Sequence, residues 1–295
     1  MKGSFLLAIG MGIFAFLGIL AGKGLTESLK SGGPAVGAQS RFPGWNIEYK
    51  LPQGWQVGQT LGRLQVLGSN TEAGAIFLAP GMYRSHEEAV ADLSQFYQSM
   101  NLQAVPVEPP KGTTIAGLRA TVATYASMDQ TGRTVHGRSI SLLTPHGTGL
   151  NMLGMTTAEQ MSRLGGTLER LAASVTAKPP SVNRQAIQAL AGTWVLYQGA
   201  YQGGSSSTGT TSRSHEETAV FDGQGSYQWQ SSSTVSVMTP GYAGGAGGAS
   251  SDSDRGTYTV IGSTLVMKGT KGQFTFDIQL EGNRLTAGGK TYLRN

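Results

Sequence analysis

The stretch Leu190-Ala191-Gly192-Thr193-Trp194 marks the point where the pattern of the sequence changes. It follows the pair Pro179-Pro180, which stops a helical pattern and predicts a short, stiff linker. Before this linker, segments with helical and strand periodicity are mixed. After it, apolar residues recur with a period of two and glycine-containing turns separate them. We therefore predict two domains, at residues 45–177 and 190–295, joined by a linker at 178–189.

Residues 190–295 predict an all-β domain. The strand candidates are Thr193–Tyr201, Arg213–Phe221, Ser226–Val237, Arg255–Val260, Thr264–Lys268, Gln273–Leu280 and Arg284–Arg294. Seven or eight antiparallel strands at this spacing form either a small barrel or a sandwich, and the pattern alone leaves both open. The glycine- and serine-rich segments 199–212 and 239–254 are expected to be loops.

Three motifs of this region resemble the lipocalin-like (calycin) family: Gly192-Thr193-Trp194, Gly256-Thr257-Tyr258 and Tyr292-Leu293-Arg294. In that family the tryptophan closes one end of a small antiparallel barrel beneath a basic residue of the last strand. The resemblance thus implies that Trp194 and Arg294 close the barrel, although an ordinary core tryptophan fits the same pattern. It also implies an interior that binds a small apolar ligand or is filled by side chains. The interior residues implied as ligand-binding are Tyr197, Tyr227, Trp229, Tyr258 and Phe276.

Residues 45–177 predict an α+β domain in the order strands, helix, antiparallel strands and closing helix. Ser85 and Glu88 have the spacing of a capping box, which predicts a helix start at this point. The closing helix, Ala158–Ser174, carries leucines at helical spacing on one face. We interpret both apolar helix faces as core.

Three stretches of this domain resemble the Mog1/PsbP-like family. They are Tyr49-Lys50-Leu51-Pro52-Gln53-Gly54-Trp55, Ile115-Ala116-Gly117-Leu118-Arg119-Ala120, and Ala172-Ala173-Ser174 in the closing helix. The family has an α/β/α sandwich fold. Its members are mostly non-catalytic: photosystem II extrinsic subunits, a Ran-binding protein and bacterial envelope lipoproteins. The resemblance therefore implies a domain for protein contacts or scaffolding and supplies no catalytic residues.

The chain begins with a charged start, Lys2, and an apolar run from Phe5 to Ala21. This run is longer than a typical signal-peptide core and shorter than a typical membrane span. It predicts an export signal at residues 1–21 or, alternatively, an N-terminal anchor that is retained. Residues 22–44 are expected to be a flexible spacer. The predicted location is periplasmic or extracellular, with membrane contact only through residues 5–21 if they are not cleaved.

Composition excludes several kinds of chemistry. The absence of cysteine rules out disulfides, thiol nucleophiles and cysteine-ligated metals. The 22 basic and 17 acidic residues are scattered without a run, which argues against nucleic-acid binding. His86, His136, His146 and His215 form no H-E-x-x-H pattern, and no G-x-S-x-G occurs. We therefore expect no metal site, no cofactor and no catalytic residues.

These observations predict an exported, non-enzymatic binding or scaffolding protein of the cell envelope. Its partner would be an unknown protein, a small apolar ligand in the C-terminal barrel, or both. One alternative is a membrane-anchored structural or assembly subunit that acts through protein–protein contacts. A second alternative is a hydrolase whose active site follows no familiar motif.

Overall fold

A computed structural model describes residues 38–99, 104–128, 132, 134–203, 210–238 and 245–295. The chain divides into two compact units between Ser181 and Val182, within the segment expected to be the linker. The predicted leader lies outside the described residues, as does the spacer up to residue 37. Within the described ranges, no helix is long and apolar enough to cross a membrane.

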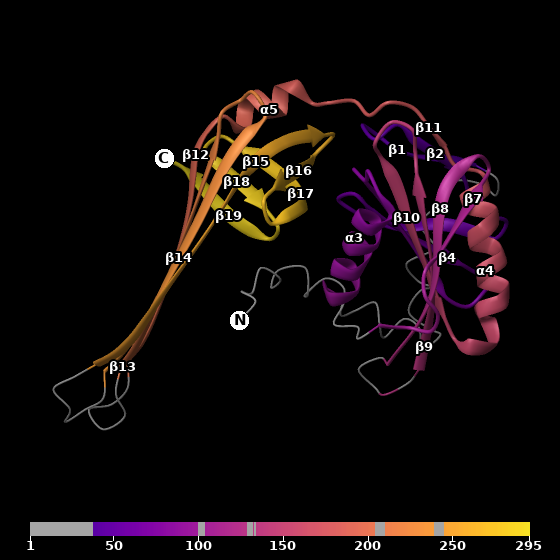
Figure 1. Cartoon of the computed structure of the whole chain (residues 1–295), viewed down its shortest axis with the longest axis horizontal. Helices are drawn as coiled ribbons and strands as arrows, with labels where there is room; N and C mark the ends of the chain where they lie inside the picture. Colours follow the sequence, from indigo (N-terminus) through magenta and orange to yellow (C-terminus); the bar gives the residue numbers. More distant parts are fainter. Residues whose placement is uncertain (1–37, 100–103, 129–131, 133, 204–209, 239–244) are drawn as a thin grey trace. The chain divides into compact units, whose positions relative to one another are not determined.

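The N-terminal unit is an antiparallel sheet with a helix on either side (Figure 1). Its strands are β3 (Trp55–Leu61), β4 (Leu64–Ser69), β5 (Ala75–Gly81), β6 (Val105–Pro106), β7 (Lys111–Ile115), β8 (Leu118–Met128), β9 (Thr134–Leu143) and β10 (Gly149–Thr156). They lie in the order β3-β4-β5-β10-β9-β8-β6, and β7 also pairs with β8. A second, three-stranded sheet joins β1 (Gln39–Phe42), β2 (Ile47–Lys50) and β11 (Thr176–Ala177).

The two main helices explain why the centre of the larger sheet is buried on both faces. All eight residues of β10 are buried, as expected for a strand that is covered from both sides. Helix α3 (His86–Ser99) places Leu93 in a buried cluster with Leu153. Helix α4 (Ala158–Ala173) places Leu164 close to Gly154, which lies on the opposite face of the same strand.

Two features of this unit bear on the sequence predictions. The backbone N–H of Glu88 donates to Ser85 Oγ at 3.3 Å, so the predicted helix start is confirmed. Strand β1 begins inside the segment that was expected to be a flexible spacer, and its Phe42 is buried. This local difference arises because β1 pairs with β2, and a period-two pattern only four residues long is too short to identify in the sequence.

The C-terminal unit is a closed barrel preceded by the short helix α5 (Arg184–Leu190). Its strands are β12 (Gly192–Gly203), β13 (Thr210–Phe221), β14 (Ser226–Met238), β15 (Gly245–Ile261), β16 (Thr264–Gly269), β17 (Gly272–Glu281), β18 (Arg284–Ala287) and β19 (Lys290–Arg294). Each strand pairs with its neighbour in sequence, and β19 closes the barrel against β12. The predicted α+β domain followed by a small antiparallel barrel is therefore confirmed, and the sandwich alternative is excluded.

Strands β12 to β15 are longer than the barrel requires. Figure 1 shows them continuing as a narrow four-stranded arm. The first of these strands meets β19 only at Trp194 and Val195, and β15 meets β16 only from Gly256 onward. In the rest of the arm, these four strands pair only with one another, in the order β12-β13-β14-β15.

The arm corrects the prediction of loops over residues 199–203, 210–212 and 245–254, while residues 204–209 and 239–244 of the same two segments lie outside the described residues. Strand β12 continues to Gly203, and β15 already begins at Gly245. Glycine and serine have low intrinsic strand propensity, but the ladder to β14 satisfies the backbone of β15 over thirteen consecutive pairs. Conversely, the single strand expected at 284–294 is two strands, because Gly288 and Gly289 both have positive φ and form a turn.

Candidate functional site

One end of the barrel is closed by a tryptophan and an arginine on paired strands. Trp194 is fully buried, and its indole N–H donates to the carbonyl of Leu190 at 2.7 Å. The guanidinium carbon of Arg294 lies 4.6 Å from the centroid of the Trp194 ring. Arg294 also donates to the carbonyl of Ala189, which ties α5 to the last strand. The structure thus brings together the two residues that the sequence named for barrel closure.

The interior next to this closure is filled by side chains. Tyr227 and Tyr258 are buried in the core. The Tyr227 hydroxyl donates to Asp254 Oδ2 at 2.7 Å, and the Tyr258 hydroxyl donates to the Ile187 carbonyl at 3.3 Å. The core cluster of buried residues comprises Leu190, Trp194, Leu196, Ala219, Phe221, Tyr227, Tyr258, Val260, Leu265, Met267, Ile278, Leu285 and Tyr292. Trp229 and Phe276 pack against it and are partly buried. Four of the five proposed ligand-binding residues therefore belong to, or pack against, this core.

Tyr197 is the exception among those five residues. Its side chain is 68% exposed, so it does not face the barrel interior as expected. The reason is strand alternation: Trp194 and Leu196 take the buried positions of β12, which turns Tyr197 outward. A period-two pattern shows that side chains alternate, but it does not determine which set faces inward, because a shift of one position in the register exchanges the two faces.

A polar network is enclosed on the inner face of β13. Glu217 is only 1% exposed, and its carboxylate accepts hydrogen bonds from Lys290 and from the Tyr292 hydroxyl, the latter at 2.6 Å. His215 Nε2 lies 2.7 Å from Glu217 Oε1, and its Nδ1 lies 2.6 Å from Ser233 Oγ. Because a carboxylate can only accept, Nε2 is the nitrogen that donates. The result is a continuous hydroxyl–imidazole–carboxylate chain.

The ionisation of this network follows from its contacts. Burial alone would raise the pKa of Glu217, but the hydrogen bonds from Lys290, Tyr292 and His215 outweigh burial and hold its pKa below the ordinary value. Burial and the Glu217 carboxylate both raise the pKa of Tyr292 well above its ordinary value. Glu217 is therefore a charged acceptor at neutral pH, and Tyr292 remains a neutral donor.

A polar groove of about 580 Å³ lies on the sheet formed by β13, β14 and β15. It is lined by Glu216, Thr218, Gln230, Ser231, Ser232, Ser251, Asp252 and Ser253. Six of these residues belong to two neighbouring cross-strand rows, Glu216–Ser232–Ser251 and Thr218–Gln230–Ser253. Both rows alternate with the row of Glu217, so their side chains lie on the outer face of the sheet. The other two residues, Ser231 and Asp252, belong to the row of Glu217, so their side chains alternate to the inner face.

Tyr197 extends one of these rows onto β12, because it is the cross-strand partner of Glu216. Directly paired residues on one face have Cβ atoms about 5 Å apart. An exposed aromatic ring therefore borders a groove of hydroxyl, amide and carboxylate groups. The groove could not be predicted from the sequence, because its rows exist only in the register that joins the three strands, and one of these strands includes a segment that was expected to be a loop.

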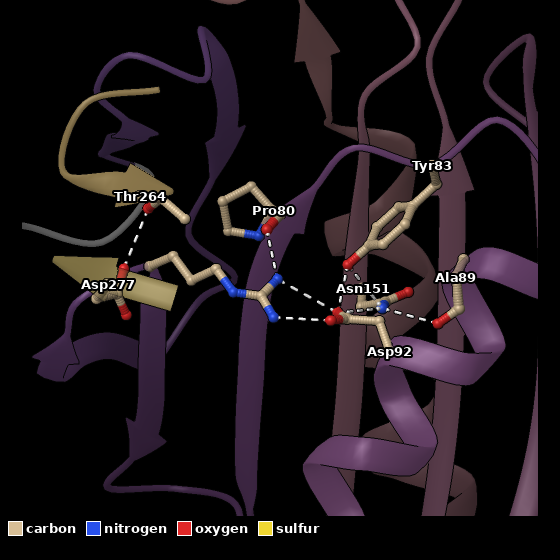
Figure 2. Close-up of polar contacts among 8 residues, drawn as sticks. Pro80, Tyr83, Ala89, Asp92, Asn151, Thr264 and Asp277 are labelled. Carbon is tan, nitrogen blue, oxygen red and sulfur yellow. Dashed lines mark hydrogen bonds and ion pairs between the residues drawn. The ribbon is translucent and has the colours of Figure 1, made fainter. Parts of the chain in front are cut away.

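The N-terminal unit holds a second polar cluster, beneath α3. Arg63 forms an ion pair with Asp92 at 2.8 Å, and Tyr83 donates to Asp92 Oδ2 at 2.5 Å. Asn151 donates to Tyr83, Ala89 and Asp92, and Figure 2 shows the Tyr83, Asp92 and Asn151 side chains converging. Burial raises the pKa of Asp92, but Arg63 outweighs it and the net pKa is lowered. The adjoining cavity of about 20 Å³ has room for one water molecule, so this cluster is structural in character.

The four histidines lie on separate elements, with His146 in the turn between β9 and β10. His86 is the first residue of α3 and contacts Thr121, whereas His136 lies on β9 and His215 on β13. Among the residues that the structure describes, no three His, Asp or Glu side chains are grouped so that they could hold a metal ion. Asp252 is paired with Lys271, and Asp254 accepts from Thr270 and Tyr227.

The sequence matches no protein-family model and no curated protein. Some solved structures resemble part of the chain. A protein of Bacteroides thetaiotaomicron is 10% identical with a TM-score of 0.36, and the match covers 49% of this chain and 49% of that one. CyanoP, the cyanobacterial PsbP of Synechocystis sp. PCC 6803, is 14% identical with a TM-score of 0.36 and coverages of 50% and 98%. Protein PA94 of Pseudomonas aeruginosa, of unknown function, is 11% identical with a TM-score of 0.33 and coverages of 48% and 97%. The match thus spans about half of the Bacteroides chain.

Proposed function

We propose that this protein is an exported, non-enzymatic binding and scaffolding protein of the cell envelope. In this proposal the N-terminal unit is a Mog1/PsbP-like domain for protein contacts, and the C-terminal unit is a lipocalin-like barrel. The apolar run from Phe5 to Ala21 supports export, and the Trp194–Arg294 pair supports the lipocalin-like assignment. The ligand-binding surface we propose is the outer groove of the barrel sheet.

The observation that carries this proposal is the contrast between the two faces of β13 to β15. The inner face packs buried side chains such as Phe221 and Tyr227 against one another. The outer face carries a groove of about 580 Å³, within the usual size range of small-ligand sites. A ligand thus has a preformed surface outside the barrel, whereas an apolar ligand inside would have to displace well-packed aromatic residues.

The test is to block the groove and follow what the protein retains. Ser232→Trp places a large side chain among the lining residues, and Ser236→Trp places the same side chain four residues further along the same face, outside the groove. Natively purified full-length protein is analysed by mass spectrometry, together with cross-linked partners. Ser232→Trp should lose the bound molecule while Ser236→Trp keeps it. Equal retention by both variants would show that the groove is not the binding surface.

The membrane-anchored alternative makes a separate prediction. If the protein is an assembly subunit held at a membrane, residues 1–21 should remain on the mature chain. If the protein is released, the intact mass should lack them. N-terminal sequencing of the native protein decides between the two.

A hydrolase is a second candidate because Ser233, His215 and Glu217 form a hydrogen-bonded chain. This connectivity can activate a serine hydroxyl, with histidine as the base and the carboxylate orienting it. A fluorophosphonate probe tests this directly. A hydrolase would be labelled at Ser233, and the label would be lost in His215→Asn but kept in Ser231→Ala. If the folded protein is not labelled, the hydrolase candidate is excluded and the binding function remains as the proposal.

A further inference from the structure

The groove on the outer face has an unusual balance of polar groups. The two outer rows of the groove carry four hydroxyl side chains, one amide and one carboxylate, and none of the groove's lining residues is Lys or Arg. Glu216 is exposed and is the one acidic residue of these two rows, because Asp252 lies in the inner row of Glu217 and is paired with Lys271. The outer face of the groove thus has one acidic side chain and no basic one among its lining residues. It also contains many groups that donate and accept at once, as hydroxyls and amides do.

The aromatic ring beside the groove adds an apolar surface. Tyr197 is 68% exposed and is the cross-strand partner of Glu216. A Cβ atom at Gly199 would lie 3.4 Å from the Tyr197 ring, so the ring leans along the strand over that glycine. An exposed aromatic ring presents a flat apolar surface at little cost in conformational entropy. Gly199 pairs with Ser214, in the row beyond Glu216, so the ring offers its apolar surface at the end of the groove that lies beyond the Glu216 row.

We propose that the groove binds a neutral saccharide, an inference that rests on the proposed binding function. Sugar hydroxyls would donate to the Glu216 carboxylate, and others would exchange hydrogen bonds with Gln230 and the serine row. The C–H face of one ring would pack on Tyr197. A cationic ligand fits less well, because it would need acceptors alone, whereas most lining groups also donate.

The test uses the full-length protein and defined probes in isothermal titration. The neutral probes are maltotriose, cellotriose and chitotriose; trilysine is the cationic probe and dextran sulfate the anionic one. We expect at least one neutral probe to bind. Glu216→Gln removes a hydrogen bond to a charged group, and Tyr197→Ala removes the aromatic contact. Each substitution should weaken binding about tenfold or more.

Two controls separate binding from folding. Tyr197→Phe keeps the ring and should retain affinity. Ser236→Ala lies further along the same outer face, outside the groove, and should bind like the unmodified protein. Each variant is checked by circular dichroism. Because Glu216 and Tyr197 are exposed, both substitutions should leave the fold intact.

The outcomes distinguish this inference from the proposed function. Binding of trilysine in place of the sugars, or sugar binding that is unaffected by Glu216→Gln and Tyr197→Ala, overturns the saccharide inference. If no sugar binds but Ser232→Trp still releases a co-purified molecule, the inference is wrong and the binding function stands. If Ser232→Trp changes nothing, both are overturned.

Discussion

The guanidinium of Arg294 lies over the indole ring of Trp194, with 4.6 Å between the guanidinium carbon and the ring centroid. The two residues are also directly paired across β12 and β19, which is the seam where the barrel closes. Arg294 further donates to Ala189 and Trp194 to Leu190, so both residues hold the end of α5. This pair of side chains therefore joins β12, β19 and α5 at one end of the barrel.

Replacing Arg294 with alanine should loosen this seam. The loss of a cation–π contact and of a hydrogen bond to the helix should cost about 1–2 kcal/mol of unfolding free energy. Hydrogen exchange should accelerate in α5 and at the start of β12. The control is Arg255→Ala, which removes an exposed arginine of β15 and should change stability by less than about 0.5 kcal/mol. Unchanged exchange in α5 would contradict the closure role.

Glu217 should make the barrel sensitive to acid. Its pKa is held below the ordinary value of 4.5, so it binds protons more weakly in the folded than in the unfolded chain. The stability this provides is complete above the unfolded pKa and is lost as the pH falls through the folded pKa. The measurement is the urea midpoint of the barrel between pH 7 and pH 3.

Glu217→Gln should make the stability of the barrel less dependent on acid. It should also lower the free energy of unfolding by about 3 kcal/mol at neutral pH, because Lys290 loses its buried counter-ion. Glu216→Gln is the matched control: it changes the adjacent, exposed residue on the other face and should leave both the midpoint and its pH dependence unchanged. An identical acid response in the two variants would mean that Glu217 is not responsible.

The elements that the sequence predicts are those with a local signal. The capping pair Ser85 and Glu88 and the glycine–tryptophan motif at Trp194 involve residues close together in the chain, and each lies where it was expected. The arm strand β15 has no such signal, since glycine and serine form a strand there only because β14 pairs with them. Glu217 likewise has hydrogen-bond partners, Lys290 and Tyr292, that lie more than 70 residues further along the chain. Contacts of this kind depend on register, which the period-two pattern does not determine.

The ion pair between Arg63 and Asp92 should be important for the N-terminal unit. Both side chains are largely buried, at 17% and 15% exposure. Arg63→Leu leaves the Asp92 carboxylate without its counter-ion and should lower the free energy of unfolding by about 3–5 kcal/mol. The double variant with Arg63→Leu and Asp92→Asn should recover part of this loss. Arg163→Leu is the control, because Arg163 is 61% exposed and its contact with Glu72 spans 3.5 Å. A double variant as unstable as the single one would indicate that packing, not charge, is lost.

Gly269 should not tolerate a side chain. It lies on β16 where the Asp254 carboxylate and the Tyr227 hydroxyl approach its backbone, and an added Cβ would collide with both. Gly269→Ala must displace this hydrogen-bonded pair and should cost about 1–3 kcal/mol. Gly248→Ala provides the comparison, since no heavy atom lies within 4 Å of the position its Cβ would take, and it should leave stability unchanged or slightly higher. Chemical denaturation monitored by hydrogen exchange of β14 and β16 measures both variants. If Gly269→Ala is as stable as Gly248→Ala, the Asp254–Tyr227 contact is not closely packed against β16.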